Sequence, residues 1–588
     1  MMHVVATAGH VDHGKSTLVR ALTGMEPDRL EEERRRGLTI ELGFAWTTLP
    51  GGDRLAFVDV PGHERLVGTM LAGVGPVPAV MFVVAADQGW QRQSEEHLAV
   101  LDALGVRHGL LAVTRCDLAD PDLADLAREE ALAHIAATSF GDVESVMVSG
   151  TTGDGLDHLR AALERLAASL PTPDADADVR LWIDRVFTVR GRGTVVTGTL
   201  GAGTIRVGDR LAVGGDVARV RGLQSLKEDH GEVSAVARVA VNLHASVRAA
   251  GRGEALLTPG RWLTADVVDV RLRGEPAHDL PRELTLHAGS AAVPVHVRPL
   301  GADTARLALR RPLPLRAGDI ALLRDPGAHR VPAGVTVLDV RPEPFRRRGA
   351  AAARARDLAS FGERPDGAAE LRRRGLITRA ELVAMGFPVP SEPVAGDWLA
   401  DPGHWEDLRK RLVAAVEEHA AAHPTDPGLP ADAARRALGL PDRALVEALA
   451  GGLRRRDGRI YGETTAPELP APVRKAVDAV RRDLGEAPFR APDADRLAEL
   501  GLTPKLLAVA AATGALLRVG DGIVLLPGDD ARAAALLAGL GGPFTLSEAR
   551  RALGTTRRVA VPLLEHLDDK GYTVRVDDLR RRCTGRGR

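Results

Sequence analysis

Residues 9–16 read GHVDHGKS and lie between a short apolar run and the helical pattern TLVRALTG. The spacing G-x-x-x-x-G-K-[ST] lets the glycines turn the backbone tightly, so that successive N–H groups point inward. A helix that begins near Lys15 adds its positive N-terminal end, Lys15 can reach the β- and γ-phosphates of a nucleoside triphosphate, and Ser16 can bind Mg²⁺. The predicted nucleotide-binding residues of this loop are Gly9, His10, Val11, Asp12, His13, Gly14, Lys15, Ser16 and Thr17. A plain glycine turn is the alternative, because the pattern also recurs by chance.

Two further segments supply candidate groups around a metal ion. The segment LAFVDVPGH at 55–63 is an apolar strand that ends in Asp59, a carboxylate placed to hold Mg²⁺ through water, with the flexible Gly62 close behind. Thr39, in RGLTIELGF, follows a charged stretch without apolar period, which is expected to be mobile until a ligand orders it. A threonine hydroxyl on Mg²⁺ is one way to order it. A solvated helix with a strand behind it is the alternative.

Polar residues at two further strand ends indicate which base is bound. The strand in GLLAVTRCD ends in Thr114, Arg115 and Asp117, and a carboxylate there can accept two N–H groups from guanine, a pattern that adenine does not offer. Discrimination of this kind is strong, because the wrong base leaves a buried charge unpaired. A fourth strand, in SVMVSGTTGDGL, ends at residues that are predicted to close over the base from the other side: Ser149, Gly150 and Thr151.

The stretches GHVDHGKST, RGLTIELGF, DVPGH and TRCD, in this order, resemble the GTP-binding domain of translational elongation factors of the EF-Tu kind. The resemblance implies GTPase activity with GTP and Mg²⁺ as cofactors, Lys15 on the phosphates, and Ser16 and Thr39 on the metal. It assigns γ-phosphate sensing to Gly62. It assigns the positioning of the hydrolytic water on the ribosome to His63, the expected catalytic residue.

The base-reading segment departs from the Asn-Lys-x-Asp that is usual in this family. Thr114 stands in place of Asn and Arg115 in place of Lys, whereas Asp117 matches and is implied to read guanine. Arg115 can still stack over the base, and Thr114 can still hydrogen-bond. Guanine therefore remains the predicted base.

Length and composition bound the remaining choices. At roughly 100–200 residues per domain, 588 residues predict four or more domains. The net charge is −1, so no global field marks a nucleic-acid partner. The cysteines, Cys116 and Cys583, make no disulfide framework, as expected in a reducing cytoplasm. The start of the chain lacks a signal pattern, and the apolar stretch at 77–86 is too short to span a bilayer, so no membrane partner is expected.

Two β-rich segments follow the predicted GTP-binding domain at 1–172. A Pro/Asp-rich linker, PTPDADAD, is followed by short alternating strands with frequent glycines, which predict an antiparallel barrel at 175–256. A second block of the same kind predicts another barrel at 257–345. Two small barrels after a GTPase domain repeat the elongation-factor plan.

Charged residues of the first barrel narrow the resemblance further. Asp184 and Arg185 stand side by side in IDRVFTVRGRGTVVTGTL, and Arg238 lies on the returning strand VARVAVNL. These two segments resemble the corresponding part of the selenocysteine-specific elongation factor family. The resemblance implies that an equivalent acid–base cluster forms the aminoacyl pocket. A selenol is largely ionised near neutral pH whereas a serine hydroxyl is not, so cationic groups can select the charged side chain. Ordinary salt bridges on a barrel surface are the alternative.

The C-terminal part reads as about four repeats of three helices and a two-stranded hairpin, the winged-helix pattern, at 346–405, 406–465, 466–528 and 529–588. In the last repeat, Arg557 and Arg558 open the probable recognition helix, and residues 555–588 hold nine Arg/Lys against five Asp/Glu. This local excess predicts contact with an RNA hairpin. A solvated basic tail is the alternative for RRRCTGRGR, and the first two repeats are expected to be mainly spacers.

The predicted fold is therefore an α/β P-loop GTPase domain, two antiparallel β-barrels and tandem winged helices. The resemblance implies a GTP-dependent elongation factor that delivers selenocysteyl-tRNA to the ribosome at recoded UGA codons and binds a selenocysteine-insertion hairpin in mRNA. We expect a cytoplasmic protein, with a monomer as the default. Two alternatives stay open: an initiator-tRNA carrier, which lacks a reason for the winged helices, and a transcription regulator with an NTPase module, which does not explain the barrels.

Overall fold

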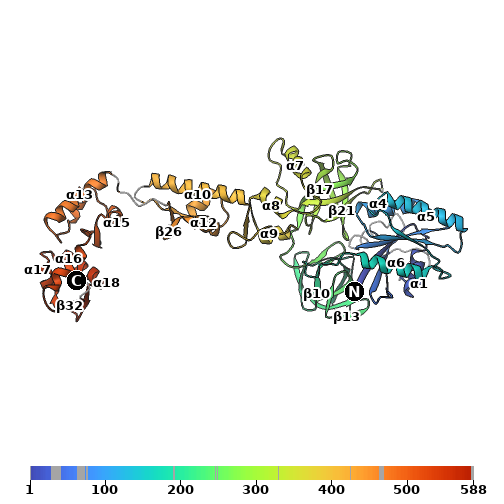
Figure 1. Cartoon of the computed structure of the whole chain (residues 1–588), viewed down its shortest axis with the longest axis horizontal. Coiled ribbons are helices and arrows are strands. Elements are labelled where there is room, and N and C mark those ends of the chain that lie inside the picture. Colours follow the sequence, from blue (N-terminus) through green and yellow to red (C-terminus); the bar gives the residue numbers. More distant parts are fainter. Residues whose placement is uncertain are drawn as a thin grey trace. The chain divides into compact units, whose positions relative to one another are not determined.

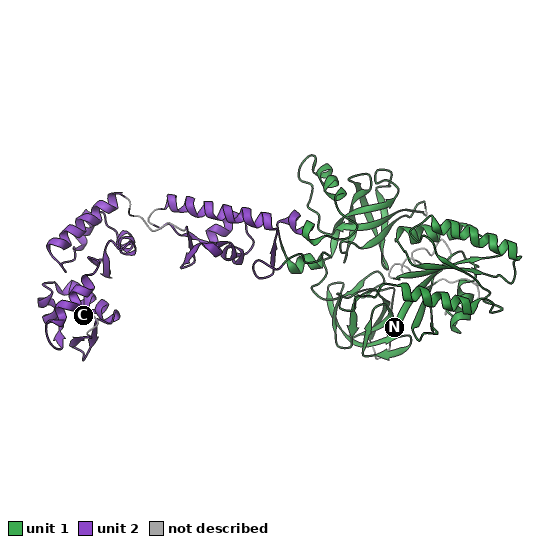
Figure 2. Cartoon of the chain, in the orientation of Figure 1, with its two compact units in different colours: residues 1–370, 377–391 green, residues 371–376, 392–588 purple. Residues whose placement is uncertain are grey.

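The computed structural model describes residues 2–27, 41–61, 70, 73, 77–189, 193–244, 247, 249–328, 330–423, 426–462, 469 and 471–584. The chain divides into two compact units (Figure 2). The first comprises residues 1–370 and 377–391, and the second comprises 371–376 and 392–588.

The N-terminal domain is built on a six-stranded sheet with the order β2-β3-β1-β4-β5-β6. Only β2 runs antiparallel to its neighbour; the other pairings are parallel. The central strand β4, AVMFVVA, is buried at every position, as expected for a parallel strand that is covered on both faces. The strands are β1 (Met2–Ala8), β2 (Gly43–Thr48), β3 (Arg54–Asp59), β4 (Ala79–Ala85), β5 (Gly109–Thr114) and β6 (Glu144–Met147).

Helices cover both faces of this sheet (Figure 1). One face packs against leucines of α1 (Lys15–Thr23) and α6 (Leu156–Ser169). The other face packs against apolar residues of α4 (Arg92–Ala103) and α5 (Pro121–Ala136). This doubly covered arrangement leaves the carboxyl ends of the parallel strands as the edge where loops can build a ligand site.

The first barrel follows from strict alternation of inward and outward residues, as in β15, where every second residue of ARVAVNL is buried. Its strand order is β11-β16-β7-β9-β15-β12-β13, and β11 also pairs with β12, which closes the ring. The strands of this sheet are β7 (Arg180–Trp182), β8 (Arg185–Val189), which pairs with β9, β9 (Gly193–Leu200), β11 (Arg210–Val213), β12 (Asp216–Ser225), β13 (Glu228–His230), β15 (Ala237–Leu243) and β16 (Ala255–Leu257). A separate two-stranded sheet is formed by β10 (Thr204–Arg206) and β14 (Glu232–Ser234).

The second barrel is closed with the order β17-β20-β19-β18-β21-β22. Helix α7 (Ala350–Ala359) is tied to it by Arg354, which bonds to the buried carboxylates of Asp269 and Asp339. The strands are β17 (Ala265–Gly274), β18 (Glu283–Ala288), β19 (Ala291–Pro299), β20 (Thr304–Leu313), β21 (Ile320–Asp325) and β22 (Arg330–Asp339).

Helix–helix–hairpin layouts recur in the second unit. The second winged helix, residues 402–461, contains α10 (Pro402–Ala422), β25 (Leu429–Pro430), α11 (Ala431–Leu438), α12 (Arg443–Leu449), β26 (Arg454–Arg456) and β27 (Arg459–Tyr461). The third, residues 471–525, contains α13 (Ala471–Glu486), α14 (Ala494–Glu499), α15 (Pro504–Ala512), β28 (Leu517–Gly520) and β29 (Ile523–Leu525). The last, residues 529–584, contains α16 (Asp529–Ala538), β30 (Phe544–Thr545), α17 (Leu546–Ala552), α18 (Arg557–Asp569), β31 (Thr573–Arg575) and β32 (Arg580–Cys583).

The first expected repeat, 346–405, holds shorter elements: α8 (Gly367–Arg374), β23 (Leu376–Thr378), α9 (Arg379–Ala384) and β24 (Trp398–Ala400). The division between the compact units runs through this segment. The predicted fold class, with its P-loop domain, barrels and tandem winged helices, is confirmed. The boundaries of the individual domains stay predictions. Across the described ranges, no helix is long and apolar enough to cross a bilayer.

Candidate functional site

The phosphate loop turns at two glycines that no other residue could replace without strain. Gly9 has a φ of 127°, and a Cβ there would lie 2.1 Å from the carbonyl oxygen of Val83 on β4. Gly14 has a φ of 78° and starts helix α1. Both positions need left-handed backbone, which only glycine adopts at no steric cost. The loop therefore crosses the ends of β1 and β4 in the manner that the sequence pattern predicts.

Lys15 lies folded along the inside of this loop. Its Nζ donates to the carbonyl oxygens of Gly9 at 2.9 Å and of His10 at 2.7 Å, and the residue is only 6% exposed. The ammonium group is thus held at the centre of the loop, beside the N-terminus of α1. This is the position from which a cation can neutralise phosphate oxygens.

Asp59, at the end of β3, is fully buried and bonded to two hydroxyl groups. Ser16 donates to its Oδ2 at 2.6 Å, and Thr7 donates to its Oδ1 at 2.6 Å. The Thr7 hydroxyl also accepts the N–H of Val60 at 3.2 Å, which anchors the start of the following segment. Mg²⁺ prefers hard oxygen donors of this kind, so the Ser16 hydroxyl and the Asp59 carboxylate fit the metal that the sequence analysis expects.

Two histidines of the loop are neutral. The rings of His10 and His13 lie 5.0 Å apart. Burial, with a smaller repulsion from His10, lowers the pKa of His13 to about 3. Burial also lowers the pKa of His10, with a contribution from Lys15. Lys15 therefore carries the positive charge of the loop at neutral pH. The attraction of the loop for phosphate is thus centred on the Lys15 ammonium group.

Side chains from α4 hold the outer part of the loop, and the sequence analysis missed them. The Gly9 N–H donates to Nδ1 of His97 at 3.1 Å, and the Val11 N–H donates to Oε1 of Gln93 at 3.0 Å. Gln93 and His97 are four residues apart and share one face of the helix. Their spacing on a polar helix is the one signal that could have pointed to them, and it is weak.

The two departures from Asn-Lys-x-Asp both contact the phosphate loop. Thr114 Oγ donates to the carbonyl oxygen of His13 at 2.7 Å. Arg115, at a φ of 57°, donates to the carbonyl oxygen of Asp12 and lies 3.2 Å from Oδ2 of Asp87. Thr114 thus ties β5 to the loop. The Arg115 guanidinium likewise binds the loop.

The base-binding candidates lie at adjacent strand ends. Asp117 is exposed beyond β5, so its carboxylate is open to a base. Ser149 is buried, and its hydroxyl accepts the N–H of Thr151 at 3.2 Å. A Cβ on Gly150 would lie 3.3 Å from Cγ2 of Thr17, so this segment packs directly beside the phosphate loop. The structure therefore brings the predicted nucleotide-binding residues that it describes to one edge of the sheet. The calls on Thr39, Gly62 and His63 lie outside the described residues.

The acid–base cluster of the first barrel is a buried ion pair. Arg238 donates two N–H groups to the Asp184 carboxylate, one of them to Oδ1 at 2.7 Å. The Asp184 side chain is 6% exposed and that of Arg238 is 13% exposed. Thr197 also donates to Oδ1 of Asp184, at 2.9 Å, and the guanidinium carbon of Arg238 lies 4.0 Å from the ring centroid of Phe44. The sequence analysis missed both Thr197 and Phe44.

A cavity of about 330 Å³ opens beside this pair, between the GTPase sheet and the first barrel. Arg185 lines it as well and donates to Oε2 of Glu41 at 2.6 Å. The cavity therefore combines two guanidinium groups with aromatic rings. Its lining includes Phe44, Trp46, Phe57, Arg185, Thr197 and Arg238.

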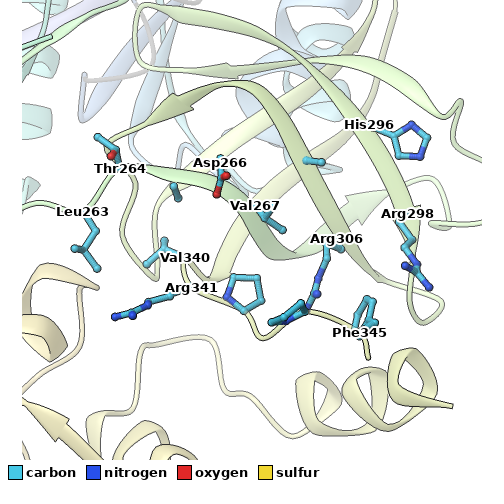
Figure 3. Close-up of a pocket in the computed structure, with 14 residues that line it drawn as sticks. Leu263, Thr264, Asp266, Val267, His296, Arg298, Arg306, Val340, Arg341 and Phe345 are labelled. Carbon is cyan, nitrogen blue, oxygen red and sulfur yellow. The ribbon is translucent and has the colours of Figure 1, made fainter. Parts of the chain in front are cut away.

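A second cavity, of about 710 Å³, lies on the outer face of the second barrel, between its strands and the segment 340–345 (Figure 3). Arg298 and Arg306 both lie over the ring of Phe345, at 4.7 and 3.7 Å from its centroid. Arg306 is also bonded to the buried Asp269 carboxylate. Arg298 is exposed and has no carboxylate partner among the described residues.

The two arginines predicted to contact RNA differ in the last winged helix. Arg557 is exposed at the start of α18. Arg558 donates to the carbonyl oxygens of Ala491 at 2.6 Å and of Pro492 at 2.8 Å, in the third winged helix. Arg558 is exposed as well, but its guanidinium ties two winged helices together.

Two regions of the chain match models of known protein families. Residues 2–169 match the family model described as the elongation factor Tu GTP binding domain, and residues 535–582 match the one described as elongation factor SelB, winged helix. The selenocysteine-specific elongation factor of Escherichia coli (strain K12) is 33% identical over 482 residues, which cover 75% of this chain and 74% of that protein. The chain belongs to the family of selenocysteine-specific elongation factors.

Two further members of this family support the assignment. The one from Desulfomicrobium baculatum is 39% identical over 341 residues, which cover 55% of this chain and 53% of that protein. A crystal structure of a bacterial selenocysteine-specific elongation factor matches 99% of this chain and all of that chain, with a TM-score of 0.78 and 26% identity. The resemblance stated from the sequence is thus confirmed, and the N-terminal domain is a translational GTPase domain of the elongation factor Tu type.

Proposed function

We propose that the chain uses GTP to deliver selenocysteyl-tRNA to the ribosome at recoded UGA codons in the cytoplasm, as a monomer. The observation that carries this proposal is the cavity beside the Asp184–Arg238 pair, because it places guanidinium groups where an aminoacyl side chain can be read. A mRNA hairpin, held by the last winged helix, recruits the factor to its codon. The family match of residues 535–582 supports this last step.

In the GTP complex, Lys15 of the phosphate loop would bind the β- and γ-phosphates, and Ser16, together with Asp59 through water, would hold Mg²⁺. The metal supplies charge neutralisation on the phosphates. Asp117 reads guanine, and Thr114 keeps the loop and the base-reading strand in register through its bond to His13. His13 is suited to its buried position because it is neutral; a charged imidazole there would be a second cation buried beside Lys15.

Arg238 and Arg185 discriminate selenocysteine from serine by charge. A selenolate carries a full negative charge and gains a charge-assisted interaction with a guanidinium, whereas a neutral hydroxyl gains only an ordinary hydrogen bond. The rings of Phe44, Trp46 and Phe57 line the cavity beside these guanidinium groups. Asp184 keeps Arg238 in place when no aminoacyl group is bound.

Arg298 on the second barrel and Arg557 on the last winged helix supply exposed cations for tRNA and mRNA phosphates, respectively. His63 positions the hydrolytic water once the ribosome aligns it. Replacing His63 with Ala is expected to leave GTP binding intact and to abolish ribosome-stimulated hydrolysis. Unchanged stimulated hydrolysis would remove this role from His63.

A binding assay with one tRNA body, charged with either selenocysteine or serine, tests the pocket. The wild-type chain in its GTP form is expected to prefer the selenocysteyl form by more than about tenfold, which corresponds to about 1.4 kcal/mol. A preference of only a few-fold would argue against the pocket. In Arg238→Met the preference is expected to fall, whereas Arg206→Met, at an exposed ion pair with Glu232 on the same barrel, should keep it.

Removing one partner of a buried ion pair can itself unfold the barrel. The double variant Asp184→Leu with Arg238→Met removes both charges and avoids a lone buried carboxylate. If this folded variant still prefers selenocysteyl-tRNA as strongly as the wild type, Arg238 does not read the side chain.

A further inference from the structure

The second winged helix ends in an arginine-rich hairpin, the wing, at residues 453–461. Its sequence, LRRRDGRIY, holds four arginines and one aspartate. Asp457 and Gly458 join β26 to β27 with positive φ values of 51° and 71°, as a two-residue hairpin turn requires. The sequence analysis expected this repeat to be mainly a spacer, so its charge has no role in the function proposed above.

The strand register places the charges on one face of the wing. Arg454 pairs with Tyr461 and Arg456 with Arg459, whereas Arg455 pairs with Ile460. Successive residues of a strand point to opposite faces. Ile460 is 3% exposed and belongs to the core of this module. The opposite face of the hairpin, which carries the pairs Arg454–Tyr461 and Arg456–Arg459, therefore points away from that core.

Arg456 and Arg459 are therefore direct cross-strand partners at the wing tip. Like charges in a cross-strand pair are destabilising. Both arginines have partners within the chain: Arg456 lies 3.4 Å from Asp457, with both side chains more than 80% exposed. Arg459 lies 3.2 Å from Asp426, with side chains 34% and 42% exposed, and donates to the carbonyl oxygen of Gly428 at 2.8 Å. Exposed ion pairs of this kind contribute little. The pair is thus an arrangement that an outside anion would stabilise.

The other two wings offer a contrast within the same unit. In the third winged helix, Arg518 is bonded to Asp521 at 2.5 Å, and β28 and β29 contain no other charged residue. In the last winged helix, Arg581 and Arg575 both pair with Asp568. Arg575 and Arg581 are also cross-strand partners, but they share the Asp568 carboxylate. The wing at 453–461 differs because Arg456 and Arg459 pair with separate carboxylates, those of Asp457 and Asp426.

We propose that the outer face of this wing binds the sugar–phosphate backbone of RNA, so that the second winged helix is an RNA-binding module. Guanidinium groups match phosphate oxygens in charge and in hydrogen-bond geometry. Tyr461, whose ring centroid lies 5.9 Å from the guanidinium carbon of Arg454, adds an aromatic surface for a ribose or a base. The contact is independent of sequence in the RNA and does not rest on the mRNA-hairpin role of the last winged helix.

The test uses the full chain and a fluorescently labelled RNA duplex of about 16 base pairs, long enough to offer two successive grooves but lacking any insertion hairpin. Fluorescence anisotropy gives the affinity between about 50 and 200 mM salt. Arg454→Gln combined with Arg456→Gln is expected to weaken binding by about tenfold or more at low salt. It is also expected to lower the slope of log affinity against log salt by about two, because two phosphate contacts are lost.

Matched controls separate the wing from general charge. Arg481→Gln with Arg482→Gln removes the same charge from exposed positions of α13 and should change affinity by less than about twofold, given only distant, screened charges. Arg454→Lys with Arg456→Lys should keep the salt slope. Repeating the titrations in an Arg557→Gln background separates the wing from the last winged helix. No binding by the wild type, equal affinity of the wing variant, or an equal loss in the α13 control would each overturn the proposal.

Discussion

Residues of like charge are cross-strand partners at several places in this chain, and two of these pairs differ in how their charges are balanced. In the second barrel, Asp269 on β17 pairs with Asp339 on β22, and both are fully buried. In the wing of the second winged helix, Arg456 pairs with Arg459 near the surface. A buried charge has to be neutralised by the chain itself, whereas a charge in solvent can wait for a partner.

The barrel pair is neutralised by arginines from two different elements. Arg306 on β20 donates to Asp269 at 2.6 and 3.0 Å. Arg354 on α7 donates to Asp269 at 2.7 Å and to Asp339 at 2.6 Å. The cluster holds two carboxylates and two guanidinium groups, so its net charge is zero without any outside ion. It also fastens α7 to the barrel, whereas the wing arginines Arg455 and Arg459 bond to the backbone carbonyl oxygens of Glu447 and Gly428.

The largest effect is expected from breaking the barrel cluster. Asp269→Ala leaves Arg306 and Arg354 without their shared partner in a dry site, and we expect a loss of about 3–5 kcal/mol of stability. Denaturant unfolding of the full chain, followed through the barrel transition, measures it. Glu232→Ala breaks the exposed pair with Arg206 and should cost less than about 1 kcal/mol. Equal losses for the two variants would contradict the contrast between buried and exposed charges.

A smaller effect is expected from a buried group that lacks a counter-ion. His287 on β18 is 8% exposed, and burial, aided by Arg324, lowers its pKa to about 4 from an ordinary value of 6.5. The unfolded chain therefore binds more protons below pH 6.5, and the barrel loses stability as the pH falls from 6.5 towards 4. Between about pH 7 and pH 5 this loss amounts to about 2 kcal/mol.

His287→Leu removes this contribution, so thermal unfolding should depend less on pH over that interval than in the wild type. His278→Leu, at an exposed histidine of the same barrel, serves as the control and should leave the dependence nearly unchanged. If His287→Leu unfolds with the same pH dependence as the wild type, protonation of the buried His287 imidazole is not the cause of the loss of stability in acid.

The smallest effect is expected at the wing. Arg456→Glu converts the like-charge pair with Arg459 into an opposite-charge pair, which should stabilise the hairpin by about 0.2–1 kcal/mol. Hydrogen exchange of the backbone amides at 454–461 in the full chain should therefore slow. Arg518→Glu, in the third winged helix, removes an existing bond to Asp521 and should speed exchange there instead. Faster exchange in the Arg456→Glu wing would contradict the reading of its charge pair as repulsive.

The sequence predicted those features that depend on local pattern. The apolar runs of the sheet, the alternation of the barrel strands and the spacing of Gly9, Gly14 and Lys15 each follow from period or turn chemistry, and the structure confirms the fold class that they indicate. Features that depend on distant contacts were out of reach. His97 lies 88 residues from Gly9, and Arg558 lies 67 residues from the carbonyl oxygen of Ala491 that it binds.

By itself, the sequence determined the order of the domains, the phosphate loop and the family to which the chain belongs. Only the tertiary structure decided which charges are neutralised inside the chain and which remain for a partner. Asp184 and Asp269 form ion pairs with arginines because strands far apart in sequence close into barrels. Arg456 and Arg459 of the wing are cross-strand partners because a hairpin turn pairs their strands. Neutralisation depends on distance and burial, and those are set by packing rather than by the letters of the chain.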